Sequence, residues 1–416
     1  MTYIKSETAQ DRSPNSISEI LHLGLAAAQQ EDWLSVDNYL KLLPQTKSRK
    51  KAKEFILNEK DWQTALDLAL SSLIKADFQS KWLLAKLIPL FGKNTIPVLI
   101  ELLLDGTLET DTRSFLCQIL GNYSDRRVIL SLVELLRSTS DVGLIETAGK
   151  TLTKIGDDAI EALSELLNES EYRLLAVQSL FYIRTAKTIA PLITVAKDGE
   201  SELKAIAIKA LSSFHDSRIP PVLIAALQDK ASKVRLEATI ALGFRPDICV
   251  ELNLVEHLRP LLHDFDLEVC RQAAISLSRM KQEVATAAIY SVSQADSTPE
   301  SLKLDMVKAL GWSEINSAIS YLEKALVNCS AIVSQEIITI LGRIKTPELK
   351  PEATKVLVNY WLEQQPLLEI PQLKQALATS LGELRCDLAK TTLEKLAKDS
   401  DRRVQLHATS ALKKLA

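Results

Sequence analysis

A pattern of fifteen residues recurs down most of this chain, and it constrains the fold more than any other feature. Its clearest copy is DKASKVRLEATIALG at residues 229–243, where Val234, Ala238 and Leu242 are spaced as one face of an α-helix. Asp229 precedes this apolar series, so its carboxylate can accept hydrogen bonds from the free N–H groups at a helix start. The pattern therefore predicts an amphipathic helix with one buried face.

The pattern repeats at intervals of 28 to 40 residues along the chain. The position of Val234 is occupied in turn by Leu83, Thr112, Leu144, Tyr172, Leu203, Val234, Val269, Leu302, Val333, Leu373 and Val404. The position of Gly243 is again glycine in five other copies, at Gly92, Gly121, Gly311, Gly342 and Gly382. Because glycine adopts the left-handed conformation that ends a helix, we predict that these glycines terminate their helices.

A second apolar segment precedes each copy of the pattern. Before Asp229 it reads RIPPVLIAAL, and Pro220 and Pro221 suit the first turn of a helix, where a missing N–H breaks no bond. Helices this short cannot bury an apolar face alone, so neighbouring pairs must stack to form a continuous core. We predict an all-α, right-handed α-solenoid, or superhelix, of about eleven short helical hairpins.

The regular repeat begins near residue 79, which divides the chain into three parts. Residues 1–15 are polar and are predicted to be disordered, residues 16–78 to form N-terminal helical hairpins, and residues 79–416 to form the solenoid. Trp33 and Trp62 follow aspartates in the hairpins, and we interpret both as packing residues. The basic segment Lys47–Lys53 lies between the hairpins, where it is either an anion-binding patch or, as we favour, a solvated connection.

Composition excludes several classes of protein. The net charge is −3, whereas nucleic-acid binders are usually basic, so nucleic acid is not expected as a partner. The five cysteines are scattered singly, which argues against a disulfide framework and a zinc site. No apolar run is long enough for a transmembrane segment, and the N-terminus lacks a signal-peptide core. We expect a cytoplasmic protein.

No cofactor or active-site motif stands out, so no catalytic or metal-binding residue is proposed. His257 and His263 are six residues apart, which on a helix points their side chains in different directions. To act as a nucleophile, Cys270 would need a partner that lowers the pKa of its thiol. As a small buried residue it would need no such partner, and we favour this second interpretation.

A basic residue follows the Val234 position in six copies, at Arg113, Arg173, Lys204, Arg235, Lys303 and Lys374. An aspartate recurs five residues before that position, at Asp198, Asp229, Asp264 and Asp399. These bases form either a surface that binds an acidic partner or pairs with the aspartates between repeats. The longest irregular stretch, around residues 244–270, could gather a further cluster. The candidate partner-binding residues are Arg173, Lys204, Arg235, Arg245, Asp247, Phe265, Asp266, Arg271 and Lys303.

The pattern D-x4-V-R-x2-A-x3-L-G resembles the short HEAT-like repeats of the phycobilisome lyase type. Residues 229–243, 264–278 and 399–413 carry it most clearly, and with FHDSRIPPVL and LGFRPD the chain looks like a cyanobacterial HEAT-repeat protein of that class. The resemblance implies a scaffold or an assembly factor. The family that the chain resembles also includes bilin lyases, which handle open-chain tetrapyrroles on phycobiliproteins. It further includes deoxyhypusine hydroxylase, a di-iron enzyme whose His-Glu pairs are absent from this sequence.

These observations favour a non-enzymatic scaffold that binds a protein partner on the concave face of the solenoid. The resemblance suggests a phycobiliprotein or another photosynthetic assembly component as that partner. The alternative is a bilin lyase or chromophore-handling subunit, in which case an open-chain tetrapyrrole would be bound; no other cofactor is expected.

Overall fold

The computed structural model describes residues 16–43, 57–327, 329–363 and 366–415. The chain forms two units, Met1–Pro191 and Leu192–Ala416, and each is described separately below. The predicted disorder of residues 1–15 and the basic segment Lys47–Lys53 both lie outside the described residues.

The first unit begins with two helical hairpins whose helices start at side-chain caps. They comprise α1 (Ile17–Gln29), α2 (Trp33–Lys41), α3 (Glu59–Lys75) and α4 (Phe78–Leu87). Ser16, Asp32, Asn58 and Asp77 each accept a hydrogen bond from the backbone N–H three residues later, at 2.9–3.2 Å. Such a bond satisfies one of the free donors at a helix start. The helices that begin at Ile17 and Trp33 lie within residues 16–78, where helical hairpins are predicted.

The remainder of this unit alternates between two layers of helices. It contains η1 (Ile88–Phe91), η2 (Lys93–Thr95), α5 (Ile96–Leu104), α6 (Thr110–Leu120), α7 (Arg126–Ser138), α8 (Val142–Ile155), η3 (Gly156–Ala159), α9 (Ile160–Leu166), α10 (Arg173–Ile183) and η4 (Ala186–Thr188). The α4, α6, α8 and α10 helices pack in series in one layer, while α5, α7 and α9 form the other.

The second unit continues the same arrangement, and the boundary between units falls within α11 (Ile189–Asp198). Its helices are α12 (Ser201–Leu211), α13 (Ile219–Ala226), α14 (Ser232–Gly243), η5 (Pro246–Ile248), α15 (Leu254–Leu258), η6 (Arg259–His263), α16 (Leu267–Met280), α17 (Glu283–Gln294), α18 (Glu300–Ser313), α19 (Asn316–Leu326), α20 (Ala331–Gly342), η7 (Pro347–Leu349), α21 (Lys350–Leu362), η8 (Pro366–Glu369), α22 (Pro371–Leu384), η9 (Asp387–Ala389), α23 (Lys390–Leu396) and α24 (Arg402–Leu415). Both prolines of the segment before Asp229 occupy the first turn of α13, as predicted.

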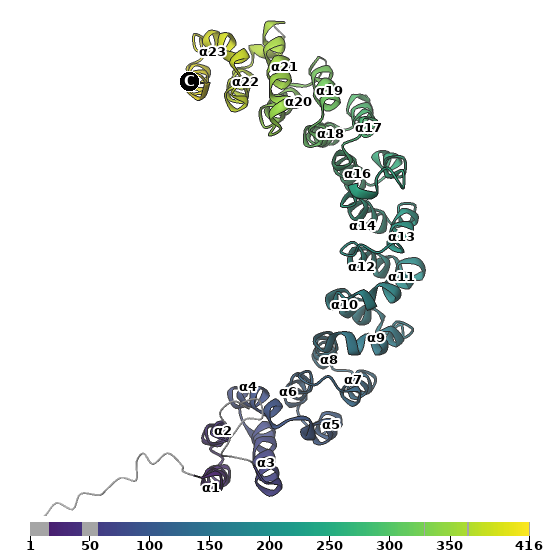
Figure 1. Ribbon diagram of the computed structural model, residues 1–416, viewed down its shortest axis with the longest axis vertical. Helices are drawn as coiled ribbons and strands as arrows, with labels where there is room; N and C mark the ends of the chain where they lie inside the picture. The colour runs from purple at the N-terminus through teal and green to yellow at the C-terminus, as the bar shows by residue number, and fades with distance from the viewer. Residues whose placement is uncertain (1–15, 44–56, 328, 364–365, 416) are drawn as a thin grey trace, which may run out of the picture. The chain divides into compact units, whose positions relative to one another are not determined.

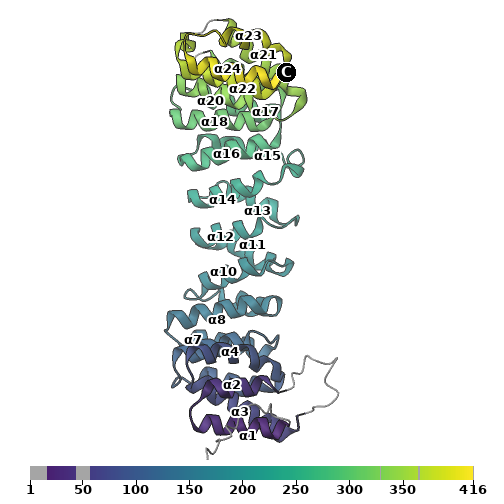
Figure 2. The same cartoon turned by 90° about the vertical axis from the view of Figure 1, so that its left-hand side faces the viewer.

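The second helices of the pairs form one layer of this unit. The α12, α14, α16, α18, α20, α22 and α24 helices each pack against the next member of the series, and the first helices α13, α17, α19, α21 and α23 lie behind them (Figures 1 and 2). Val234, Ala238 and Leu242 are fully buried, which confirms the predicted core face of α14. We call the exposed side of this layer the second-helix face of the unit.

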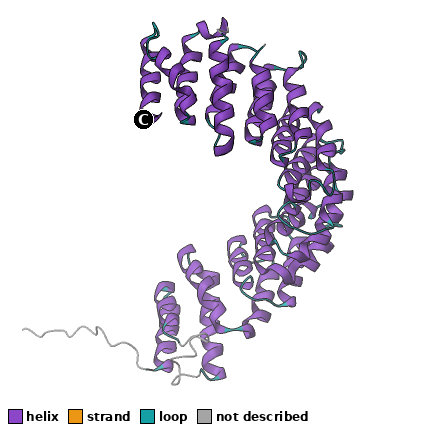
Figure 3. Cartoon of the chain, turned by 45° about the horizontal axis from the view of Figure 1, so that its top comes forward, coloured by secondary structure: helices purple, strands orange, loops and turns teal. Residues whose placement is uncertain are grey.

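Every regular element among the described residues is helical, and none is a strand (Figure 3). Helical pairs that stack in register and bury a common core are the defining feature of an α-solenoid. The prediction of an all-α solenoid is therefore confirmed.

The recurring glycines have a different role from the one predicted. Gly92 alone among the six has a positive φ, of 92°, whereas Gly243 is the last residue of α14. A Cβ atom on Gly243 would clash with Ser276 Oγ in α16, and one on Gly342 would lie 2.6 Å from the Cα of Ser380 in α22. Apart from Gly92, these glycines permit close approach of neighbouring second helices. The helices end at or within two residues of the glycines, as predicted, but apart from Gly92 the glycines do not adopt the left-handed conformation that was expected to end them.

Left-handed residues do end several of these helices, but three residues after the glycine position. Arg184, Lys281, Glu314 and Arg385 take φ values of 45–55° directly after α10, α16, α18 and α22. None of them is glycine, and a non-glycine residue in this region costs about 1 kcal/mol. Gly156 takes the same place after α8, with a φ of 81°, so glycine occupies this left-handed position in one copy of the repeat.

Within the described part of the chain, no single helix is long and apolar enough to cross a membrane. One pair, Phe78–Phe91 with Lys93–Leu104, meets the length and composition requirement jointly, across a bend of 114°.

Candidate functional site

The second-helix face of the Leu192–Ala416 unit exposes a regular stripe of side chains. On α14 the stripe contains Leu236 and Ile240, which lie on the side of the helix away from Val234 and are half-buried, and it ends at Phe244 just beyond the helix. The core holds the opposite face of each helix, so the stripe is only partly covered by the repeat.

The C-terminal end of this stripe concentrates aromatic and cationic side chains. The position of Phe244 is occupied on α16, α18 and α20 by Arg279, Trp312 and Arg343, and we call these four residues the C-terminal row. Phe244 is 59% exposed and Trp312 is 56% exposed. The Arg279 guanidinium lies 4.4 Å from the centre of the Phe244 ring, a cation–π contact that holds both side chains at the surface.

A pocket of about 430 Å³ adjoins this row between α18 and α20. Trp312 lines it together with the bases Lys308 and Arg343 and the acids Glu314 and Glu336. Glu314 accepts hydrogen bonds from Thr346 Oγ1 and from the Lys345 amide, the latter at 3.3 Å, so this carboxylate is already engaged. The pocket can receive an apolar side chain beside the indole, with polar groups at its rim.

The predicted basic series forms ion pairs between successive repeats. Lys204 contacts Asp229 at 3.0 Å, and Lys374 contacts Asp399 at 2.8 Å. Arg235 donates two hydrogen bonds to Asp264, at 2.6 and 2.7 Å, and a third to the Asp229 carbonyl at 2.8 Å. These pairs match the interpretation in which the bases and aspartates join neighbouring repeats.

The aspartates of these pairs are held in the ionised form. Burial alone would raise the pKa of Asp264, but the hydrogen bonds from Arg235 and from the Asp266 amide outweigh it, and the net pKa is below its usual value. The same balance lowers the pKa of Asp229 and of Asp399. The side chains of Arg235 and Asp264 are only 14% and 6% exposed, which leaves little of this pair accessible to a partner.

Other residues at the same position bond to the backbone. Arg113 donates to the Leu103 carbonyl and Arg173 to the Leu167 carbonyl, at 2.9 and 2.7 Å. Cys270 takes the place of a base and donates to the Asp264 carbonyl at 3.1 Å. Lys303 has no anionic partner among the described residues and lines a polar pocket of about 360 Å³ with Glu300 and Cys329.

The candidates from the irregular stretch do not form one cluster. Arg245 pairs with Asp247 at 2.8 Å beyond the C-terminal end of α14. Phe265 and Asp266 lie at the other end of the parallel helix α16, where Asp266 caps the helix by accepting from the Glu268 amide. Phe265 is fully exposed and therefore fills no gap in the core.

Arg271, the remaining candidate, bridges two helices of the second-helix face. Its Nε donates to Asp305 on α18 at 2.8 Å, and its guanidinium also contacts Glu268.

The described residues contain no group of three or more His, Cys, Asp or Glu side chains that could hold a metal ion. His257 and His263 are both exposed. Cys270 is buried, and burial raises the pKa of its thiol, which disfavours the thiolate that a nucleophile requires.

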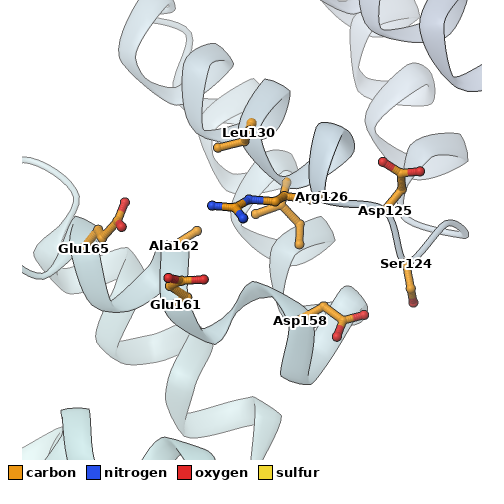
Figure 4. Close-up of a pocket in the computed structure, with 9 residues that line it drawn as sticks. Ser124, Asp125, Arg126, Leu130, Asp158, Glu161, Ala162 and Glu165 are labelled. Carbon is orange, nitrogen blue, oxygen red and sulfur yellow. The ribbon is translucent and has the colours of Figure 1, made fainter.

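A smaller pocket, of about 240 Å³, lies between α7 and α9 in the first unit. Its lining includes the acids Asp125, Asp158, Glu161 and Glu165. Figure 4 shows the Arg126 side chain extending toward Glu161 and Glu165, whereas the Asp158 carboxylate points away from it.

The stacked helical pairs described above correspond to a known family. A family model described as HEAT repeats matches residues 96–181, 168–243 and 189–276. Residues 96–276 therefore match HEAT repeats. No curated protein sequence matches the chain.

One of three similar solved structures supports the same fold. Kap121p bound to Nup53p is similar over 97% of this chain and 49% of Kap121p, with 13% identity and a TM-score of 0.53, so this chain spans about half the length of that karyopherin. Human deoxyhypusine hydroxylase in complex with glycerol matches over 64% of this chain and 98% of its own, at 20% identity and a TM-score of 0.28. An engineered protein matches over 91% of this chain and 98% of its own, at 21% identity and a TM-score of 0.39. The likeness to the karyopherin supports a HEAT-repeat solenoid and nothing more specific.

Sequence reasoning placed partner contacts on the basic series and missed most of the C-terminal row. Arg279, Trp312 and Arg343 occupy a single register position, ten residues after the Val234 position. An alignment of the repeats at that position would have found them. Their significance depends on exposure, which the alignment does not contain.

Proposed function

We propose that this HEAT-repeat protein is a non-enzymatic scaffold that binds a protein partner on the second-helix face of its Leu192–Ala416 unit. The observation that carries the proposal is the C-terminal row, in which Phe244 and Trp312 remain more than half exposed beside Arg279. Large aromatic residues and arginine supply most of the binding energy in protein interfaces.

The row has the arrangement of a binding surface. Scattered exposed apolar residues are normal on any protein, but here they share one register position on helices that pack in series. Ile240 and Ile275 extend the apolar surface along α14 and α16 and are themselves half-buried. A partner segment lying along the row would contact several repeats at once, as extended solenoid surfaces allow.

The fold is compatible with this role. Kap121p, whose fold is similar, is bound to Nup53p in its solved structure. We do not extend that partner to this chain, and we propose only that this chain also binds a protein on its solenoid surface.

For the partner, we propose a phycobiliprotein or another component of a photosynthetic assembly. What supports this choice is the resemblance of residues 229–243, 264–278 and 399–413 to HEAT-like repeats of the phycobilisome lyase type. The choice is tested by sedimentation of the purified chain with a phycobiliprotein. We expect a complex that dissociates when Phe244 and Trp312 are replaced by alanine, and the absence of any complex would exclude this partner.

The alternative is a bilin lyase or chromophore-handling subunit, and it rests on the same resemblance. The pocket beside Trp312 offers an indole and the bases Lys308 and Arg343, which are groups suited to a flat ligand that carries carboxylates. Absorbance spectra of phycocyanobilin with the purified chain, with and without an apo-phycobiliprotein, test it. Unchanged spectra would remove this alternative and leave the scaffold proposal intact.

The scaffold proposal itself is tested with matched variants and affinity capture from the native cell. Phe244→Ala, Arg279→Ala and Trp312→Ala are combined in one chain, and Val250→Ala, Val284→Ala and Leu388→Ala form the control, because these three side chains are also 55–75% exposed in the same unit. We expect the first triple variant to lose the partner by at least about tenfold and the control to retain it. Equal retention by both would contradict the proposal, provided that circular dichroism shows both to be folded.

A further inference from the structure

The largest of the four described pockets lies in the Met1–Pro191 unit and has no acidic lining. Its volume is about 590 Å³, within the range of ligand-binding sites. The lining contains Trp82, Lys86, Lys93 and Lys154, with the amides of Gln118 and Asn122. The other three described pockets each contain at least two carboxylates in their lining.

The pocket is formed by a break in the chain after α4. Gly92 takes its positive φ of 92° there, and the backbone turns sharply between η1 and α5. Trp62 Nε1 donates to the Phe91 carbonyl at 3.2 Å, which fixes the break from the neighbouring helix α3. Tyr123 is buried beneath the pocket, and its hydroxyl bonds to Thr95 Oγ1 at 2.8 Å. The floor is therefore rigid, and the lysines project from separate elements around it.

None of the three lysines forms a salt bridge with a carboxylate among the described residues, although, behind the larger effect of the hydrogen bonds from Arg127, the charge of Lys93 helps to lower the pKa of Asp125. Lys86 Nζ lies 3.2 Å from the centre of the Trp82 ring, Lys154 Nζ donates to Asn122 Oδ1 at 2.9 Å, and Lys93 is exposed. Ammonium groups elsewhere in this unit, such as those of Lys150 and Lys187, pair with nearby acids. A concave site thus holds three ammonium groups without a salt bridge to a described carboxylate, in a chain whose net charge is −3.

We propose that this pocket binds an acidic peptide segment of a protein partner, with carboxylates on the three lysines and an apolar side chain against Trp82. The lysines come from α4, η2 and α8, so their charge is spread along the pocket and suits several carboxylates in one extended segment. Trp82 is 47% exposed, and together with Pro89 it provides the apolar surface that such a segment would cover. Complementary charge of this kind accelerates association and fixes the register of a bound segment.

The proposal concerns a different unit from the C-terminal row and stands or falls independently of it. The probe is a short fluorescein-labelled peptide of repeated Glu-Glu-Leu triplets, and its binding to the full chain is followed by fluorescence anisotropy. One variant combines Lys86→Glu, Lys93→Glu and Lys154→Glu. Its control combines Lys60→Glu, Lys75→Glu and Lys187→Glu, which changes the net charge equally at exposed positions of the same unit that do not line the pocket.

We expect the pocket variant to weaken peptide binding by at least about tenfold, the control to bind like the parent chain, and Trp82→Ala to weaken binding in part. Added salt should also weaken binding, because the lysines are exposed. The proposal is overturned if the parent chain does not bind the peptide or if both triple variants bind it equally. It is also overturned if single-stranded oligouridylate binds more tightly than the peptide through the same lysines.

Discussion

Asp37 is a buried carboxyl group whose environment opposes its charge. It lies on α2 and is 1% exposed; Ser72 Oγ donates to Oδ1 at 3.3 Å, while Oδ2 has no hydrogen-bond partner among the described residues. Burial raises the pKa of Asp37 to about 6, and the hydrogen bonds from Ser80 and Ser72 reduce this effect only in part. The N-terminal hairpins therefore contain a group that destabilises them when it ionises.

This pKa predicts how stability changes with pH. Because the folded chain holds the proton more tightly than the unfolded chain, the stabilising effect is complete below pH 4 and is lost as the pH rises through about 6. Asp37→Asn cannot ionise, so its stability relative to the parent chain should increase by about 2 kcal/mol between pH 4 and pH 7. Urea unfolding across this pH range measures the difference. A difference that does not change with pH would contradict the raised pKa.

The basic series provides a second test on single residues. Lys204→Met and Arg235→Met each leave a partly buried aspartate without its charged partner, and should cost about 1.5–3 kcal/mol in unfolding free energy. Lys303→Met is the matched control, because Lys303 occupies the same repeat position without an anionic partner among the described residues, and we expect it to change stability by less than about 0.5 kcal/mol. Equal costs at all three positions would show that the ion pairs are not the cause.

At the scale of elements, contacts between second helices require glycine where the helices come closest. A Cβ on Gly342 would meet the backbone of the next second helix, at 2.6 Å from the Ser380 Cα. On Gly311 it would meet side-chain atoms of Ile340 and no backbone, with Cγ2 nearest and Cβ at 3.4 Å. Backbone can move only by separating the helices, whereas a side chain can change rotamer.

Gly342→Ala should therefore be more destabilising than Gly311→Ala. We expect a loss of about 1–3 kcal/mol for Gly342→Ala, from overpacking between α20 and α22, and a smaller loss for Gly311→Ala. Denaturant unfolding of both variants provides the comparison. Gly106→Ala is the control, since no atom lies within 4 Å of the added Cβ. The close-approach explanation fails if both helix variants are as stable as the parent chain.

At the scale of the whole molecule, each unit is a series in which repeats contact their neighbours along the chain. In the second unit α14 packs on α12 and α16, and α22 packs on α20 and α24. Stability in such an array is approximately a sum of terms within repeats and between adjacent repeats. Damage to one repeat should therefore spread to its neighbours and fade with distance.

Leu242→Asp tests this local coupling. Leu242 is fully buried, so the substitution places an unpaired charge in the core and should cost several kcal/mol. Hydrogen exchange followed by mass spectrometry should show faster exchange in α12–α16 and little change in α22–α24. Uniformly faster exchange through the unit would mean that it unfolds as one cooperative body, and no change anywhere would mean that the core face of α14 was misassigned.

The sequence by itself determined the elements and their pairing. The spacing of Val234, Ala238 and Leu242 requires a helix with one apolar face, and helices this short must stack. Local hydrogen bonds at Ser16 and the prolines of α13 are likewise short-range features that the chain encodes directly. These are the parts of the fold that were predicted correctly.

The tertiary structure alone decided what the recurring residues do. Gly243 is the last residue of α14 and also lies in close contact with α16, and only the position of Ser276 reveals the second role. Arg235 could face a partner or Asp264, and the choice depends on the next repeat, 29 residues away. Exposure of Phe244 and Trp312 likewise depends on which face of each helix its neighbours cover. Periodicity specifies which residues lie together on one face of a helix, whereas packing between repeats determines which face is buried and which remains free to bind.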